Sequence, residues 1–245
     1  NKTLENEENV FIEAIEFLKK FLIINGSFWI DRQLKAGKTI LAEGAQGTLL
    51  DIDHGNFPFV TSSSTIAGGV CIGLGIAPNR IGKIYGLFKA YCTRVGSGPF
   101  PTELFDETGE KLQKQGNEFG STTGRPRRCG WLDIPSLKYA VMINGVTNLV
   151  MTKGDVLSIF ETLKVATSYN YNNKKNDYLP FDISDNKAIP EFIELPGWKV
   201  AVDKIQDVAN LPAELLSYIN FIEKSVKTRI TILSLGPDRK QTFNL

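Results

Sequence analysis

The chain has 245 residues, of which 42% are apolar and 22% are charged, and its formal net charge is +1. This length and composition suit a soluble globular protein with a substantial core. A net charge this small argues against a broad surface for nucleic acid or membrane. Three widely spaced cysteines and a single histidine argue against a disulfide framework or a metal cluster, so we expect a reducing compartment, the cytoplasm.

The N-terminal part of the chain is predicted to be mainly helical. Apolar residues recur at helical spacing over 11–26, after a polar lead-in of residues 1–8 that we expect to be frayed. A second helical segment follows at 27–35. The apolar run 39–42 lies between two glycines and predicts a short buried strand of a parallel sheet.

The rest of the chain is predicted to alternate between strands and helices. We expect strands at 83–95, 148–151 and 229–233, and helices at 107–118, 135–143 and 212–227, with Asp133 as the N-cap of the helix at 135–143. Residues 163–171, followed by the polar loop 172–177, predict an antiparallel hairpin. No linker or repeat divides the sequence. We therefore predict one α/β domain over residues 1–245, with a largely parallel sheet flanked by helices and an antiparallel hairpin appendage.

One loop, Gly116–Trp131, is the most unusual stretch of the sequence. It contains three arginines in four positions, two adjacent threonines and four glycines, and neither helical nor strand periodicity fits it. Guanidinium groups match carboxylate and phosphate oxygens two bonds at a time, and glycines let backbone N–H groups approach a ligand. The pattern indicates an anion-binding loop. The alternative is a solvated basic turn.

A second candidate, Thr152-Lys-Gly-Asp155, directly follows a predicted buried strand. The carboxylate of Asp155 can accept hydrogen bonds from the adjacent N1–H and N2–H₂ of guanine, a donor pair that adenine lacks. The stem of Lys153 can lie along the base while its ammonium stays in water. The alternative is a strand-to-helix turn in which Asp155 caps the next helix.

Five stretches of the sequence closely resemble the adenylosuccinate synthetase family, in the family's order. They are Glu43–Gly55, Val95–Leu104, Gly120–Trp131, Thr152–Asp155 and Leu233–Arg239. The resemblance implies a synthetase fold related to P-loop NTPases, here incomplete. It also implies GTP-dependent ligation of IMP and L-aspartate to adenylosuccinate, the first committed step from IMP to AMP, by a homodimer that uses Mg²⁺.

The resemblance assigns a role to each matching residue. IMP would be bound by Gln46, Thr61, Val95 and Arg125. Aspartate would be bound by Ser121, Thr122, Thr123, Gly124, Arg125 and Arg127. GTP would be bound by Arg127, Lys153, Gly154, Asp155, Ser234, Leu235 and Gly236. Arg125 and Arg127 would also support the transition state by electrostatic clamping.

Each assignment has a plainer alternative, and two positions depart from the family pattern. Gln46 can be an ordinary loop amide, Thr61 a helix N-cap, and 234–236 a C-terminal turn. Gly154 stands where the family usually has another residue, and Pro126 replaces a basic residue found in some relatives.

The sequence contains no phosphate loop, neither G-x-x-x-x-G-K-[ST] nor the Gly-Asp-Glu-Gly-Lys-Gly type that opens this family. That loop supplies the family's catalytic aspartate and magnesium site, and its catalytic histidine lies in another N-terminal motif. We therefore expect no catalytic residue and no metal ligand in this chain, which resembles the C-terminal portion of a synthetase. His54, beside two aspartates, is expected to be structural. The alternatives are a guanine-nucleotide-binding module and an inactive structural fragment.

Overall fold

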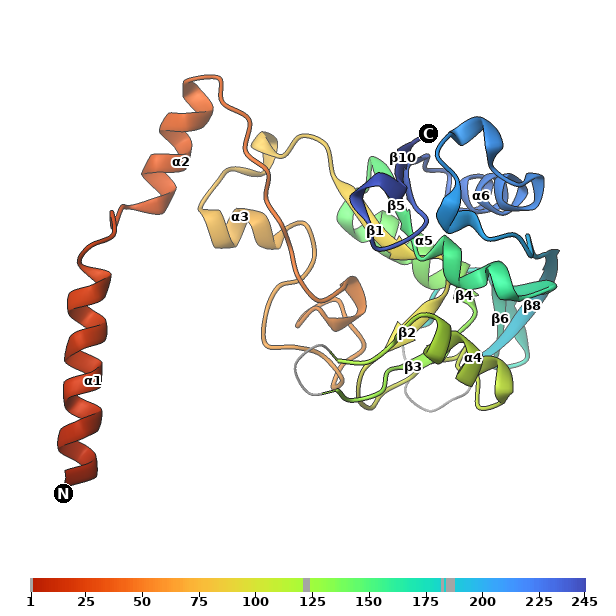
Figure 1. Ribbon diagram of the computed structural model, residues 1–245, viewed down its shortest axis with the longest axis horizontal. Helices are drawn as coiled ribbons and strands as arrows, with labels where there is room; N and C mark the ends of the chain where they lie inside the picture. Colours follow the sequence, from red (N-terminus) through yellow and green to blue (C-terminus); the bar gives the residue numbers. More distant parts are fainter. Residues whose placement is uncertain (1, 121–123, 182, 184–187) are drawn as a thin grey trace. The chain divides into compact units, whose positions relative to one another are not determined.

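The computed structural model describes residues 2–120, 124–181, 183 and 188–245. The chain divides into two compact units. The first comprises residues 1–43 with 70–80, and the second comprises residues 44–69 with 81–245. Every residue proposed above as a binding residue belongs to the second unit. Figure 1 labels most of the helices and strands of both units.

The first unit is helical. It contains α1 (Lys2–Leu18), α2 (Gly26–Lys35), most of α3 (Gly69–Leu74) and the 3₁₀ helix η2 (Pro78–Arg80). Helix α1 begins at Lys2 and ends at Leu18, so the prediction of a frayed lead-in followed by a helix to Gly26 was wrong at both ends. Leucine, glutamate and lysine are strong helix formers, whereas three of the four residues in the run 21–24 are aromatic or β-branched, namely Phe21, Ile23 and Ile24, and favour helix less.

The strand expected at 39–42 is absent from the structure. These residues have no regular secondary structure, and Leu41 is 90% exposed. A strand is stable only when a neighbouring strand bonds its backbone groups, and none of the strands in the described part of the chain pairs with this segment.

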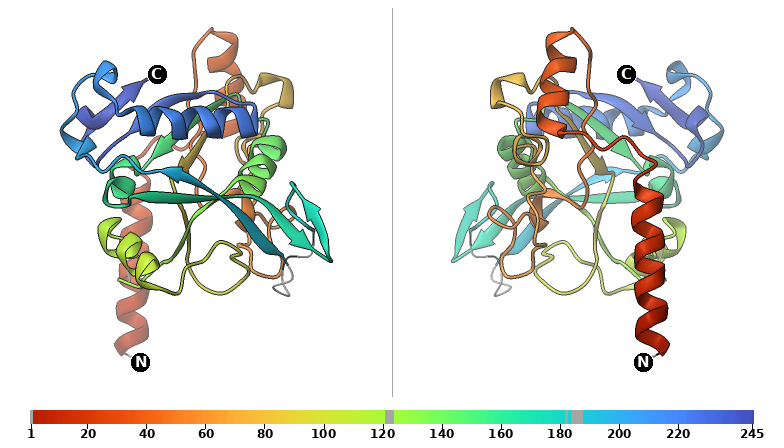
Figure 2. Two further views of the ribbon diagram at one scale, coloured as in Figure 1. Left: turned by 90° about the vertical axis from the view of Figure 1, so that its right-hand side faces the viewer. Right: turned by 90° about the vertical axis from the view of Figure 1, so that its left-hand side faces the viewer.

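The second unit is built on a largely parallel sheet, as predicted. Its strands are β1 (Tyr85–Lys89), β5 (Asn148–Thr152), β9 (Ile230–Ser234) and β10 (Thr242–Asn244), side by side in that order. Strands β1, β5 and β9 are parallel, whereas β10 is antiparallel to β9. Helices α5 (Ile134–Asn144) and α6 (Ala213–Val226) contact each other beside the sheet (Figure 2). Asp133 caps α5 by accepting a bond from Ser136, as the sequence predicted.

A second sheet contains the predicted hairpin. Strand β6 (Thr162–Tyr171) pairs antiparallel with β7 (Lys174–Asn176) and with β8 (Ile189–Pro196), and parallel with β4 (Leu132–Asp133). Strand β8 was not predicted. It contains two prolines, which obscure a strand pattern but are tolerated at a sheet edge, and β8 pairs with β6 alone among the described strands.

The long strand predicted at 83–95 is two strands in different sheets. It breaks at Ala90 and Tyr91, which are both almost fully buried, and resumes as β2 (Cys92–Arg94), paired with β3 (Arg128–Gly130). The break is fixed by tertiary contacts, because the Tyr218 hydroxyl donates to the Ala90 carbonyl.

The remaining elements are short. They are α4 (Glu107–Gln115) and the 3₁₀ helices η1 (Thr48–Leu50), η3 (Gly154–Ile159), η4 (Val202–Lys204), η5 (Val208–Asn210) and η6 (Arg239–Gln241). Within the described ranges, no helix has both the length and the apolar character that crossing a bilayer requires.

Candidate functional site

The candidate site lies at the carboxyl edge of the parallel sheet. Strands β1, β5 and β9 run in the same direction, so their last residues, Lys89, Thr152 and Ser234, share one edge. Ligands of open α/β sheets bind beyond the carboxyl ends of the strands. The two loops expected to contact guanine, 153–155 and 234–236, follow neighbouring strands at this edge.

A tight contact joins these two loops. Gly154 is buried, and a Cβ added to it would lie 2.7 Å from Cδ2 of Leu235, whose side chain is fully buried. On the other side of the contact, Ser234 Oγ donates to the Gly236 carbonyl over 3.1 Å, and Leu235 N donates to the Gln241 carbonyl over 2.9 Å. The glycine that departs from the family pattern is therefore the residue that lets the second loop approach the first.

The structure differs from the expectation for the Lys153 ammonium and from the alternative interpretation of Asp155 as a helix cap. Lys153 has a positive φ of 64° and occupies the N-cap of η3, so Asp155 lies inside the first turn and does not cap the helix. The Lys153 ammonium does not simply extend into water, because Nζ donates to the Gly116 carbonyl over 2.9 Å. This bond ties the loop after β5 to the start of the arginine-rich loop.

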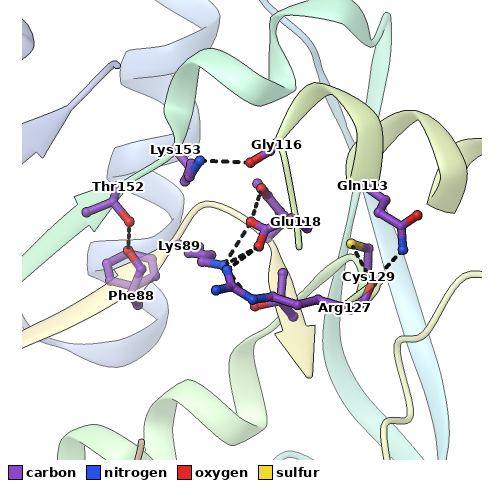
Figure 3. A network of polar contacts seen from close by, with 11 residues as sticks. Phe88, Lys89, Gln113, Gly116, Glu118, Arg127, Cys129, Thr152 and Lys153 are labelled. Atoms are coloured by element: carbon purple, nitrogen blue, oxygen red, sulfur yellow. Dashed lines mark hydrogen bonds and ion pairs between the residues drawn. The ribbon is translucent and has the colours of Figure 1, made fainter. Parts of the chain in front are cut away.

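A buried carboxylate, that of Glu118, organises the neighbourhood of Arg127 (Figure 3). Glu118 is fully buried and accepts hydrogen bonds from Lys89 Nζ at 2.8 Å, Tyr91 Oη at 2.6 Å and Arg127 Nη1 at 2.7 Å. The backbone of Arg127 is held as well, since its N–H donates to the Glu118 carbonyl and its carbonyl accepts from Gln113 Nε2.

The electrostatics of this cluster follow from burial and pairing. Burial raises the pKa of Glu118, but hydrogen bonds from Lys89, Tyr91 and Arg127 outweigh it and leave the pKa below its ordinary value. Burial lowers the pKa of Lys89 more than Glu118 raises it. Burial, with Glu118 nearby, raises the pKa of Tyr91 far above its ordinary value. Burial raises the pKa of Cys129 to about 11, so this residue is a neutral thiol at pH 7.

Arg128, the next residue, has a different role. Its Nε and Nη2 donate to the Glu103 carboxylate, and its Nη1 donates to the carbonyls of Gly96 and Gly98. These bonds engage the whole guanidinium fork with the protein itself. Of the arginines that the sequence presents as one group of donors, Arg128 is structural and braces the loop after Val95.

The arms of the arginine-rich loop are drawn together by backbone bonds. Gly120 N donates to the Arg125 carbonyl, and Gly124 N donates to the Gly120 carbonyl, both over 2.8 Å. Gly124 has a φ of 63°, which suits a residue without a side chain. The Arg125 side chain is exposed. Three predicted aspartate-binding residues, Ser121, Thr122 and Thr123, lie outside the described residues.

The loop that contains Thr61, one of the residues expected to bind IMP, is built on Asp51. This buried carboxylate accepts four backbone N–H groups, from Asp53, His54, Thr65 and Ile66. Burial raises its pKa, but these bonds outweigh burial and leave the pKa below its ordinary value. His54 acts through its backbone, whose carbonyl accepts from the Tyr139 hydroxyl.

Of the four residues expected to bind IMP, Thr61 and Val95 lie on segments that are joined by a hydrogen bond. Thr61 is anchored by its N–H, which donates to the Leu50 carbonyl. Arg94, directly before Val95, donates to the Phe59 carbonyl over 3.2 Å and so joins the two segments. Gln46 is exposed and has a φ of 63°, and among the described residues its side chain makes no hydrogen bond to Thr61 or Val95.

Sequence reasoning missed the supporting residues of the site. Lys89 and Tyr91 lie outside the five recognised stretches, and Asp51 lies inside one but received no role. The roles of all three depend largely on partners that are distant in sequence. Glu118 offered one signal, since it is the only acidic residue between Gly116 and Trp131. An acidic residue inside a basic loop indicates an ion pair with a nearby cation.

Comparisons with known proteins identify the family of this chain. The profile of the family described as adenylosuccinate synthetase matches residues 2–243. The adenylosuccinate synthetase of Christiangramia forsetii is 56% identical over 240 residues, which cover 98% of this chain and 57% of that protein. The adenylosuccinate synthetase of Flavobacterium johnsoniae is 58% identical over 236 residues, which cover 96% of this chain and 56% of that protein.

A solved structure gives the same result. The fully ligated adenylosuccinate synthetase of Plasmodium falciparum matches with a TM-score of 0.91 and 38% sequence identity, covering 98% of this chain and 58% of that one. The chain has the mixed α/β architecture of these synthetases, with a largely parallel sheet flanked by helices. It belongs to the adenylosuccinate synthetase family and spans somewhat more than half the length of the relatives it matches.

Proposed function

We propose that this chain forms the part of an adenylosuccinate synthetase that binds IMP, L-aspartate and the guanine of GTP. The complete enzyme would ligate IMP and aspartate to adenylosuccinate, releasing GDP and phosphate. One observation carries the proposal. The loops after β5 and β9 meet at Gly154 and Leu235, and Lys153 bonds Gly116 of the arginine-rich loop, so a nucleotide loop and an anion-binding loop adjoin.

Within this proposal, each loop has a separate task. Asp155 accepts the N1–H and N2–H₂ donors of guanine, while the backbone of 234–236 closes over the base. Arg127 offers a fork that is fixed at Nη1 and one-third exposed. Arg125, with Gly124 and the threonines before it, meets the aspartate carboxylates and the IMP side of the site. Gln46, Thr61 and Val95 contact IMP.

Further parts of the proposal concern the whole protein. The cytoplasm is supported by three free cysteines, which suit a reducing compartment. A homodimer is inferred from the family resemblance. Mg²⁺ does not fit the residues at hand, since no group of three or more acidic, histidine or cysteine side chains among the described residues can hold a metal ion.

The first test uses the isolated 245-residue chain. We expect no adenylosuccinate above background from IMP, GTP, aspartate and Mg²⁺, because the sequence carries no phosphate loop to hold the transferred group. The measurement is the absorbance change on adenylosuccinate formation, with a complete synthetase containing this chain as the positive control. Turnover by the chain alone, with its mass verified, would contradict this part of the proposal.

A second test separates the proposed ligase function from the two alternatives, a guanine-nucleotide-binding module and a structural fragment. We expect aspartate binding to a complete synthetase containing this chain to require IMP, because Arg125 is proposed to bridge both ligands. A guanine-nucleotide-binding module would bind GDP without any response to IMP or aspartate. A structural fragment would bind none of the three ligands in isothermal titration.

A further inference from the structure

The burial of Glu118 calls for a physical explanation. A fully buried carboxylate is costly unless it is paired and hydrogen-bonded, and removing one partner of such a pair leaves an uncompensated charge. Three side chains from different parts of the fold donate to Glu118. They are Lys89 at the end of β1, Tyr91 between β1 and β2, and Arg127 in the arginine-rich loop. The carboxylate therefore joins the sheet edge to the loop.

Among the three donors to Glu118, Arg127 has further N–H groups that a ligand could accept from. Its Nη1 is bound to Glu118, and its side chain is 32% exposed. Among the described residues, no second carboxylate pairs with this guanidinium. Arg128 provides the contrast, because its fork is fully engaged with Glu103 and two backbone carbonyls. Fixing one nitrogen of a planar fork sets the direction in which the remaining donors point.

The backbone around Arg127 restricts it further. Its N–H donates to the Glu118 carbonyl over 2.9 Å, and its carbonyl accepts from Gln113 Nε2 over 2.7 Å. Glu118 thus holds Arg127 through both its own backbone and its side chain. The main chain and one end of the guanidinium are fixed, while the other end of the side chain remains available to a ligand.

We propose that Glu118 is a positioning residue that acts through Arg127. Its carboxylate, which accepts from both Lys89 and Arg127, holds the Arg127 guanidinium in the orientation that receives an anionic ligand. That ligand is a carboxylate or a phosphate group. Glu118 itself does not touch the ligand. This inference rests on the proposed function, because it requires Arg127 to contact aspartate or GTP.

The test is a double-mutant cycle in a complete synthetase that contains this chain. We expect Glu118→Gln to lower kcat/KM for aspartate or GTP about 10- to 100-fold, because a misplaced fork loses its directed bonds. The KM for IMP should stay within about twofold of wild type. In an Arg127→Leu background, Glu118→Gln should add less than about threefold, since residues that act as one unit are not additive.

The outcomes separate the inference about Glu118 from the proposed role of Arg127. If Arg127→Leu is impaired but Glu118→Gln matches wild type, or if the two effects multiply, the inference about Glu118 is wrong and the proposed function stands. If Arg127→Leu itself leaves both KM values and kcat unchanged, the proposed role of Arg127 is wrong.

Two further variants separate a positioning role of Glu118 from a general loss of folding. Asp133→Asn is the matched control, because Asp133 is another buried carboxylate with structural partners, Tyr169 and Ser136. It should lower thermal stability without the selective KM change. If Glu118→Gln does not fold, Glu118→Asp keeps the charge but shortens the side chain. A raised KM for aspartate or GTP that is non-additive with Arg127→Leu would then support the inference, and unchanged values would overturn it.

Discussion

The two halves of the candidate site are held in place by different means. The guanine-side loops, 153–155 and 234–236, extend from adjacent parallel strands and meet at a close-packed contact between Gly154 and Leu235. The arginine-rich loop also has backbone bonds, but its arginines are held by side-chain bonds, above all those of Glu118 and Glu103. The comparison suggests that sheet topology sets the shape of the first half, while a few buried charges set the second.

This difference predicts how each half responds to substitution. Changes in the arginine-rich loop should act on charge and orientation, and so on catalysis. Changes in the guanine-side loops should act on one nucleotide and on its KM.

The largest effect is expected at Arg125. In a complete synthetase, we expect Arg125→Leu to lower kcat about 10²- to 10³-fold, the usual cost of losing one donor that stabilises transition-state charge. The control is Lys174→Ala in the exposed hairpin, a surface change worth about 0.5 kcal/mol of stability or less. Equal effects of the two variants on kcat would show that the loop is not part of the active site.

The next effect concerns the choice of base. Asp155→Asn replaces a carboxylate oxygen with an amide that faces a donor of guanine, and a bond to a charged group is worth about 1.5–3 kcal/mol. We expect the KM for GTP to rise about tenfold to a hundredfold. The same amide suits the C2 carbonyl of xanthine, so kcat/KM for XTP relative to GTP should increase. A ratio equal to that of wild type would contradict the guanine assignment.

A smaller effect should follow from filling the contact between the guanine-side loops. Gly154→Ala places a methyl group 2.7 Å from Leu235, and overpacking costs at least about 1 kcal/mol. We expect the KM for GTP to rise about fivefold while the KM for aspartate changes little. Gly82→Ala is the control, because its Cβ would meet nothing within 4 Å. An unaltered KM for GTP would mean that this contact does not shape the nucleotide site.

The smallest effect is a pH dependence of stability. The pKa of folded Glu118 is lowered, so the stability that its ionisation contributes is fully present above the ordinary value of 4.5 and is lost as the pH falls below it. We expect the urea midpoints of wild type and Glu118→Gln to converge as the pH falls from 7 toward 3. Asp51→Asn should converge likewise, because the pKa of Asp51 is also lowered. Parallel curves for wild type and Glu118→Gln would contradict the pairing at Glu118.

The sequence by itself determined the class of fold and the location of the loops. Buried apolar runs at 148–151 and 229–233 predicted parallel strands, and both are present as β5 and β9. The Asp133 cap and the hairpin at 163–177 were also predictable, since caps and turns depend on residues close together in the sequence.

Only the tertiary structure decided where strands break and which charges pair. The apolar run 83–95 looks continuous, yet buried bonds to Tyr218 and Glu118 divide it at residues 90–91. Arg127 and Arg128 are chemically identical neighbours, and only their partners distinguish their roles. Glu118 orients the guanidinium of Arg127, whereas Glu103 holds Arg128 in a structural role. Such roles depend on groups that are distant in the chain, and the folded backbone alone brings those groups together.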